Sequence, residues 1–199
     1  MDGELEHMPG YYSDHAIDFW FRLFVFGQEL WPRLESATRS FLASAETEFR
    51  AHRDDPGFDL SGAAVSYGKA VETELNALIF PALRRILRDK PPHEREVRED
   101  GRLLDLRGSV PHQTLGSIKH LLEHQDIVQA ALRKVMPHDH SWTLGVLPRE
   151  LASIVELRNS GAHSETTSAS ALDGIRRQIL GIGSDGLLGQ LVRVGMRAR

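Results

Sequence analysis

Arg158, Asn159 and His163 are the residues of this sequence whose types and spacing best suit chemistry. They lie in the stretch ELRNSGAH, residues 156–163. A histidine exchanges protons near neutral pH, and an arginine binds phosphates or carboxylates through paired hydrogen bonds. On a helix, Asn159 and His163 are four residues apart and share a face, so Asn159 can steer the imidazole. The stretch therefore indicates acid–base chemistry beside a fixed positive charge.

The position of Arg158 raises a question, because it continues an apolar stripe. Leu147, Leu151 and Ile154 precede it on the same face of the predicted helix. A guanidinium on a burying surface is costly unless another group pairs with it. Either Glu156 or a neighbouring helix supplies that partner inside a scaffold, or the patch, with Gly161 allowing close approach, meets a second copy of the chain.

Three other arginine–histidine pairs have the same spacing, so the spacing alone is weak evidence for a site. Random placement of the arginines and histidines gives about one pair at this spacing, and the sequence holds four. The other three are Arg88 with His93, Arg107 with His112, and Arg133 with His138. Each of those has a proline before the histidine, which prevents a continuous helix. Only the pair Arg158 and His163 passes this test.

The RNSGAH stretch resembles the motif of the HEPN superfamily, helical bundles with an arginine, an adjacent polar residue and a histidine four to six residues after the arginine. Two further stretches, SYGKAVETELN (66–76) and TLGSIKHLL (114–122), are similar to the helices that precede this motif in bacterial members. The resemblance covers about residues 60–195. It implies a HEPN-like up-and-down helical bundle at 59–199, to which residues 1–58 add an N-terminal helical hairpin.

The resemblance also implies an activity, namely metal-independent cleavage of RNA at a homodimer interface. The ribose 2′-hydroxyl would attack the adjacent phosphate, with His163 of one chain as base and that of the other as acid. Arg158 would stabilise the phosphorane, and Asn159 would fix the histidine tautomer. No metal or cofactor is needed, and the products carry a 2′,3′-cyclic phosphate and a 5′-hydroxyl.

The family further implies a setting in toxin or antiviral defence systems, with an antitoxin or regulatory protein as a partner. Many such toxins carry a tyrosine two places after the histidine, which their antitoxin modifies, but this chain has Glu165 there. The alternative is a non-catalytic HEPN-like module that binds RNA or another protein.

A rival motif, HLLEH at 120–124, fits the pattern of inverted zincins. His120 and His124 could face one zinc ion, with Glu123 as base and a third ligand from Glu150, Glu156 or residues 138–140. The protease fold that carries this motif is too large for 199 residues. We expect both histidines on the solvated flank of their helix.

The stretch GIGSDG at 181–186 has the glycine spacing of a dinucleotide-binding loop. That fingerprint requires a preceding strand and a later acidic residue. Here a predicted helix precedes it and the chain ends soon after. We interpret it as a helix end, with Ser184 or Asp185 capping the next turn.

Two groups of side chains are expected to serve packing or solvation. The aromatic residues Phe19, Trp20, Phe24 and Phe26 are interpreted mainly as core. Glu72 and Glu74 are expected on the solvated flank of their helix.

Composition fits a globular cytoplasmic protein. Hydrophobic residues make up 41% of the chain and charged residues 26%. A formal charge of −4 argues against a protein that coats nucleic acid, although it leaves room for a local site. The absence of cysteine excludes disulfides and thiolate metal sites. The most apolar run, residues 19–27, is too short to cross a membrane.

Helical periodicity predicts an all-α fold without strands of any length. Residues 89–112 are predicted to form an exposed charged loop with at most a short element at 102–107. The predicted helices run from Ser13 or Asp14 to Leu30, from Pro32 to Arg53, from Ser61 to Asp89 with a kink at Pro81, from the cap Thr114 to Met136, from Leu147 or Pro148 to His163, and over 170–195 with an interruption at 181–186.

Overall fold

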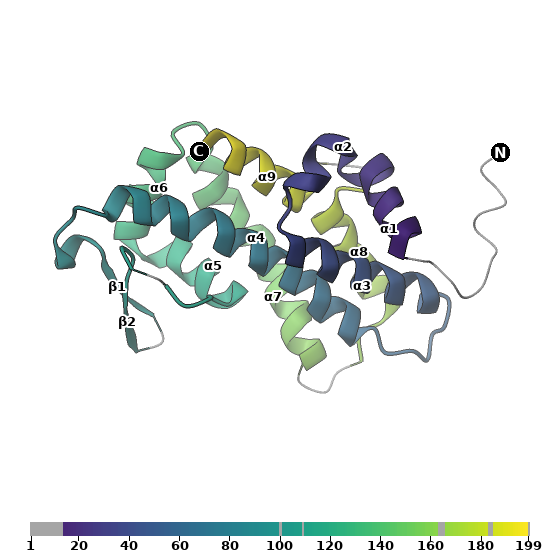
Figure 1. The fold of residues 1–199 in the computed structure, drawn as a ribbon. Helices are drawn as coiled ribbons and strands as arrows, with labels where there is room; N and C mark the ends of the chain where they lie inside the picture. Colours follow the sequence, from purple (N-terminus) through teal and green to yellow (C-terminus); the bar gives the residue numbers. More distant parts are fainter. Residues whose placement is uncertain (1–13, 100, 109, 163–165, 183–184, 199) are drawn as a thin grey trace.

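The long helix α4 (Ser61–Leu87) forms the axis of the fold, and the other main helices lie along it (Figure 1). The computed structural model describes residues 14–99, 101–108, 110–162, 166–182 and 185–198. α3 (Ser36–His52) and α7 (Leu147–Ala162) share the largest contact surfaces with α4. α4 continues through Pro81, and its buried face includes Val71, Leu75 and Ile79. The all-α prediction is thus confirmed.

The remaining helices are short and surround this axis. They are α1 (Asp14–Trp20), α2 (Gly27–Leu30), α5 (Leu115–His124), α6 (Asp126–Val135), α8 (Ala169–Leu180) and α9 (Leu187–Ala198). One continuous apolar core joins residues from α1 to α9, so the N-terminal segment up to residue 58 packs against the rest of the chain. None of the helices in the described ranges is long and apolar enough to span a bilayer.

The predicted first helix is interrupted. A π-helical turn at Phe21–Val25 follows α1, and Gly27, with φ of 72°, begins α2. Trp31 is buried and stacks on Phe21 with ring centroids 4.7 Å apart. Phe19 and Phe24 are 59% and 72% exposed. The expectation that they belong to the core is wrong for these two, because the buried face of this segment carries Ile17, Phe21 and Phe26 instead.

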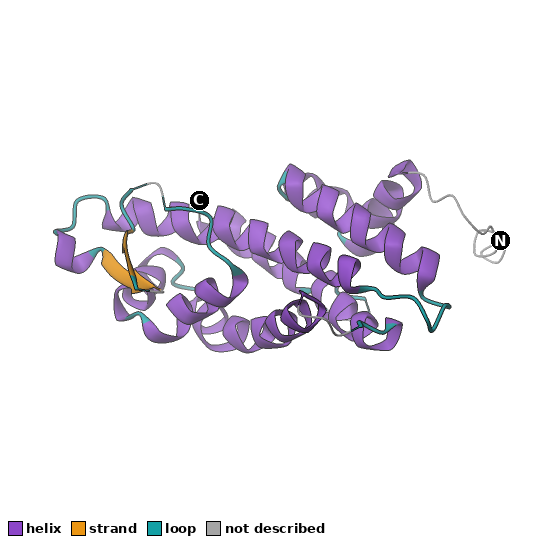
Figure 2. Ribbon diagram, turned by 90° about the horizontal axis from the view of Figure 1, so that it is seen from below, coloured by secondary structure: helices purple, strands orange, loops and turns teal. Residues whose placement is uncertain are grey.

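The charged segment after α4 contains a β-hairpin, so the expectations of a fold without strands and of a wholly exposed loop are wrong. The short element expected at 102–107 coincides with the second strand of this hairpin. β1 (Glu96–Glu99) pairs antiparallel with β2 (Arg102–Asp105), and Gly101, with φ of 74°, lies in the turn. Figure 2 shows the two strands at one end of the molecule. Val97 and Leu106 are buried at 3% and 1% exposure, so the segment is anchored to the core rather than wholly exposed. Strands of four residues, EVRE and RLLD, are too short to show a clear alternation of apolar and polar residues.

The helix predicted from Thr114 to Met136 is two helices. Thr114 caps α5 as expected, since its side chain accepts a hydrogen bond from the N–H of Ser117. Gln125 is extended, with φ of −105° and ψ of 102°, and separates α5 from α6. Gln129 donates from α6 to the carbonyls of Leu122 and Glu123, and so satisfies the open end of α5.

The glycine-rich stretch at 181–186 ends a helix, as the sequence indicates. Gly181 is left-handed, with φ of 82°, and its N–H bonds to the carbonyl of Arg177. Ser184, named as a cap for the next turn, lies outside the described residues.

Candidate functional site

The predicted site residues lie at the C-terminal end of α7. Leu147, Leu151 and Ile154 are buried at 0–1% exposure, as the stripe predicts. Arg158 follows on this face with its side chain 19% exposed, and Asn159 is exposed. His163 lies outside the described residues. The structure therefore describes two of the three motif residues.

Arg158 is paired with a buried carboxylate on α4. Its Nη1 lies 3.0 Å from Oε2 of Glu72, whose side chain is 1% exposed. The expectation that Glu72 and Glu74 lie on a solvated flank is wrong, because both are buried. A neighbouring helix thus supplies the partner that the guanidinium requires on an apolar stripe.

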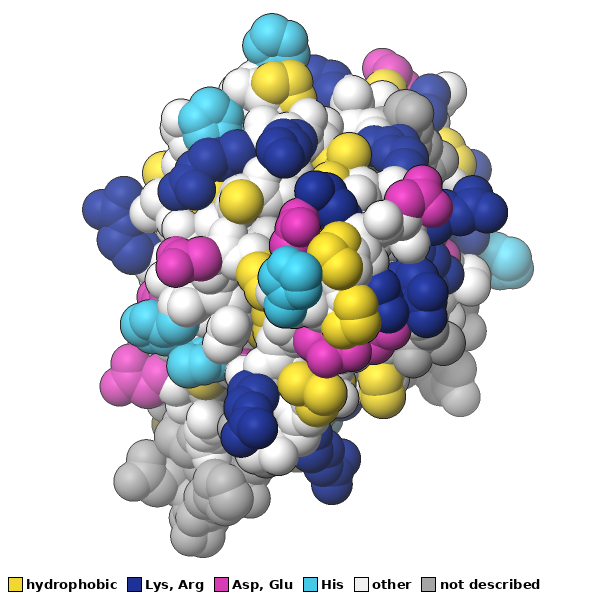
Figure 3. Space-filling model, turned by 90° about the vertical axis from the view of Figure 1, so that its left-hand side faces the viewer, with side chains coloured by type: hydrophobic (Ala, Val, Ile, Leu, Met, Phe, Trp, Pro, Cys, Tyr) yellow, Lys and Arg dark blue, Asp and Glu magenta, His cyan; other side chains and the backbone are white. Residues whose placement is uncertain are grey.

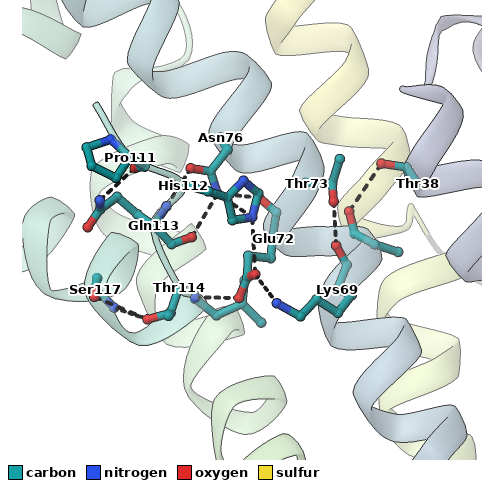
Figure 4. A network of polar contacts seen from close by, with 12 residues as sticks. Thr38, Lys69, Glu72, Thr73, Asn76, Pro111, His112, Gln113, Thr114 and Ser117 are labelled. Atoms are coloured by element: carbon teal, nitrogen blue, oxygen red, sulfur yellow. Dashed lines mark hydrogen bonds and ion pairs between the residues drawn. The ribbon is translucent and has the colours of Figure 1, made fainter. Parts of the chain in front are cut away.

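Three further donors converge on Glu72 (Figure 4). Lys69 Nζ donates to Oε1 at 2.7 Å, and His112 Nε2 lies 3.2 Å from the same oxygen. The backbone N–H of Leu115 donates to Oε2 at 3.2 Å. Burial favours the neutral carboxyl, but Lys69, Arg158 and the Leu115 N–H hold the pKa of Glu72 below its ordinary value. Glu72 is therefore an anion at neutral pH that joins α4, α5 and α7.

Asn76 fixes the segment that carries His112. Its side chain donates to the carbonyl of Gln113 at 2.8 Å and accepts from the N–H of Gln113 at 2.9 Å (Figure 4). The Asn76 amide also lies 3.4 Å from His112 Nε2. Lys69, Glu72 and Asn76 follow one another at helical spacings of three and four, which places them on one face of α4. That face orients the imidazole.

The result is a cluster of two cations, Lys69 and Arg158, and the His112 imidazole around one buried carboxylate. The side chains of Lys69 and His112 are 37% and 53% exposed, whereas that of Glu72 is 1% exposed. Positive groups therefore face solvent, and the negative charge lies beneath them. Such an arrangement suits an anionic ligand.

The sequence does not predict a role for His112 or Lys69. Pro111 interrupts any helix between Arg107 and His112, but this break does not prevent His112 from contacting other helices. The available signal was the spacing of Lys69, Glu72 and Asn76 within SYGKAVETELN. Spacing can reveal a polar face, but the fold alone shows that residue 112 returns to it.

The HLLEH histidines lie away from this cluster, on α5. The side chains of His120 and His124 are 49% and 61% exposed, and their rings are 4.8 Å apart. Glu99 of β1, rather than a proposed third ligand, lies 3.6 Å from His120. In the part of the chain that the structure describes, no group of three potential ligands could hold a metal ion. Figure 3 shows the hairpin end of the molecule, where histidine, basic and acidic side chains are intermixed.

A second buried network joins α3, α4 and α8. Glu46 is fully buried and accepts hydrogen bonds from Arg176 at 2.7 and 2.8 Å, from Arg50 at 2.5 Å and from Tyr67 at 2.6 Å. Burial favours the neutral form of Glu46, yet Arg176 and the other donors hold its pKa below the ordinary value. Burial and the Glu46 charge raise the pKa of Tyr67. The donors and the carboxylate of this network satisfy one another, so the network stabilises the packing of α3, α4 and α8.

The fold and site together define a class: an all-α protein whose longest helix carries a buried glutamate ringed by cationic side chains. No protein-family model, curated protein or solved structure matches the chain.

Proposed function

We propose that this protein is a metal-independent endoribonuclease of the HEPN type, which cleaves RNA by attack of a ribose 2′-hydroxyl on the adjacent phosphate. Arg158 stabilises the charge on the phosphorane, Asn159 orients the catalytic imidazole, and His163 transfers the proton. Two chains form the site, and no metal or cofactor takes part.

The observation that supports this proposal is the fixed position of Arg158. The ion pair with Glu72 holds the guanidinium at the edge of a buried surface, with Lys69 and His112 beside it. A preorganised cation stabilises a developing negative charge without rearranging during the reaction. An arginine retained only for solubility would not need a buried carboxylate beneath it.

The proposed setting is the cytoplasm, in a toxin or antiviral defence system. A homodimer supplies the second imidazole, and an antitoxin or regulatory protein restrains the activity. Glu165 occupies the place of the tyrosine that some antitoxins modify, so we expect restraint through binding rather than through modification of that position.

The test is incubation of the pure protein with total RNA in EDTA. We expect cleavage to products that end in 2′,3′-cyclic phosphate, and loss of cleavage in His163→Ala. Arg158→Ala should reduce the rate by about 10²-fold. Arg149→Ala is the matched control, since Arg149 is an exposed arginine on the same helix. A wild-type protein that leaves RNA intact, or a His163→Ala variant as active as wild type, would refute the proposal.

A second candidate is a non-catalytic module that binds RNA or another protein. One observation favours it: Glu72 joins Arg158 of α7 to the Leu115 N–H of α5, so the arginine has an architectural role of its own. This candidate predicts RNA binding, or capture of a protein partner, with no cleavage. Expression in cells separates the two, because growth arrest that vanishes in His163→Ala requires the nuclease.

A further inference from the structure

Hydrogen-bonding capacity remains on the three side chains around Glu72, namely Lys69, His112 and Arg158, beyond their contacts to it. Lys69 has three ammonium donors and Arg158 has five N–H donors. Lys69 Nζ lies 2.7 Å from Glu72 Oε1, and Arg158 Nη1 lies 3.0 Å from Glu72 Oε2. His112 contacts Glu72 through Nε2, which leaves Nδ1 available. Glu72 is the one acidic partner of each of the three within the described ranges.

We propose that Lys69, His112 and Arg158 together bind one phosphate group of a single-stranded RNA. This inference rests on the proposed function and adds two residues that the HEPN motif does not include. Lys69 and Arg158 supply two positive charges beside one carboxylate, so a phosphodiester, with one negative charge, balances the surplus. Glu72 lies beneath the cations at 1% exposure and holds them in place.

All three side chains of this site come from one chain. Lys69 comes from α4, His112 from the segment before α5, and Arg158 from α7, and they share one carboxylate. Asn76 fixes the backbone of Gln113, so the imidazole is oriented before the ligand arrives. Such preorganisation lowers the entropic cost of binding.

The test uses a fluorescent 2′-O-methyl oligoribonucleotide, which lacks the attacking hydroxyl and so binds without being cleaved. Anisotropy in EDTA gives its affinity for the full chain. We expect Lys69→Ala and His112→Ala each to weaken binding about tenfold, and Lys69→Ala to lower the slope of log affinity against log salt by about one. His112→Gln keeps a donor towards Glu72, so it should lose less affinity than His112→Ala does.

The matched control is His93→Ala, because His93 is 79% exposed and lies outside the cluster. It should bind as wild type does. Unchanged affinity in correctly folded Lys69→Ala and His112→Ala variants overturns the inference. If RNA is cleaved and these variants still bind normally, the phosphate site alone fails. If the oligonucleotide binds as expected and natural RNA stays intact, the phosphate site holds and the nuclease proposal fails.

Discussion

Gly68 of α4 lies directly against the side chain of Arg158. A Cβ at residue 68 would be 3.0 Å from Cδ of the arginine, closer than ordinary van der Waals contact. Glu72 is one turn further along α4 and receives the guanidinium of the same arginine. Residues 68 and 72 thus position Arg158 together: one leaves space for its aliphatic part, and the other binds its charge.

The first prediction concerns Gly68→Ala. The added methyl group should displace Arg158 by a few tenths of an ångström, and RNA cleavage should fall severalfold. Alanine favours a helix over glycine by about 1 kcal/mol, which offsets the crowding, so the melting temperature should change little. Gly174→Ala is the control, because Gly174 is also in a helix and its Cβ would meet nothing within 4 Å. Equal activity of the two variants would contradict this role for Gly68.

The second prediction concerns Glu72→Gln. This change keeps the shape but removes the charge, so Lys69, His112 and Arg158 lose their common partner. Breaking a buried ion pair from one side costs about 3 kcal/mol, and the free energy of unfolding measured in urea should fall by this order. Glu156→Gln, at an exposed position on α7, should change it by less than about 0.5 kcal/mol. A loss no larger than that of the control would show that Glu72 is not needed for stability.

The sequence predicts the helical class and most helix ends because these depend on local signals. Thr114 caps a helix and Gly181 ends one through interactions within a few residues. The stripe through Leu147, Leu151 and Ile154 likewise depends only on helical periodicity.

The features that the sequence does not predict depend on contacts between distant residues. The sequence places Glu72 on a solvated flank because a glutamate is rarely buried unless paired. Lys69 is a local partner, but His112 and Arg158 lie 40 and 86 residues away. The hairpin at Glu96–Asp105 is stabilised by the burial of Val97 and Leu106 against the core. No local pattern reveals such pairing.

The third prediction concerns acid stability through Glu46. Its pKa is lowered in the folded protein, so its contribution is full above the unfolded glutamate pKa, near 4.5, and is lost as the pH falls through the lower, folded value. Glu46→Gln should be less stable at pH 7 by about 3 kcal/mol. The gap from wild type should narrow as the pH falls below 4.5. Thermal melts from pH 7 to 3 measure both effects, and a constant gap would contradict them.

The fourth prediction concerns Glu74, whose pKa shifts in the opposite direction to that of Glu46. Burial raises its pKa, although its Oε1 accepts a 2.6 Å hydrogen bond from the N–H of Glu35 at the start of α3. Ionisation therefore opposes folding, and this cost appears as the pH rises through the folded pKa. Glu74→Gln keeps an acceptor for the Glu35 N–H and should raise the melting temperature at pH 7 but not at pH 4. A lower melting temperature at pH 7 would mean that the charge itself is needed to cap α3.

The fifth prediction concerns the attachment of the His112 segment. Asn76 exchanges two hydrogen bonds with the backbone of Gln113, at 2.8 and 2.9 Å. Asn76→Asp keeps the acceptor for the Gln113 N–H but removes the donor and brings a charge near the Gln113 carbonyl, at a cost of about 1–3 kcal/mol. The released segment should let His112 leave Glu72, so oligonucleotide affinity should fall about as far as in His112→Ala while the contribution of Lys69 remains. Wild-type affinity in a folded Asn76→Asp variant would show that the imidazole is positioned without this attachment.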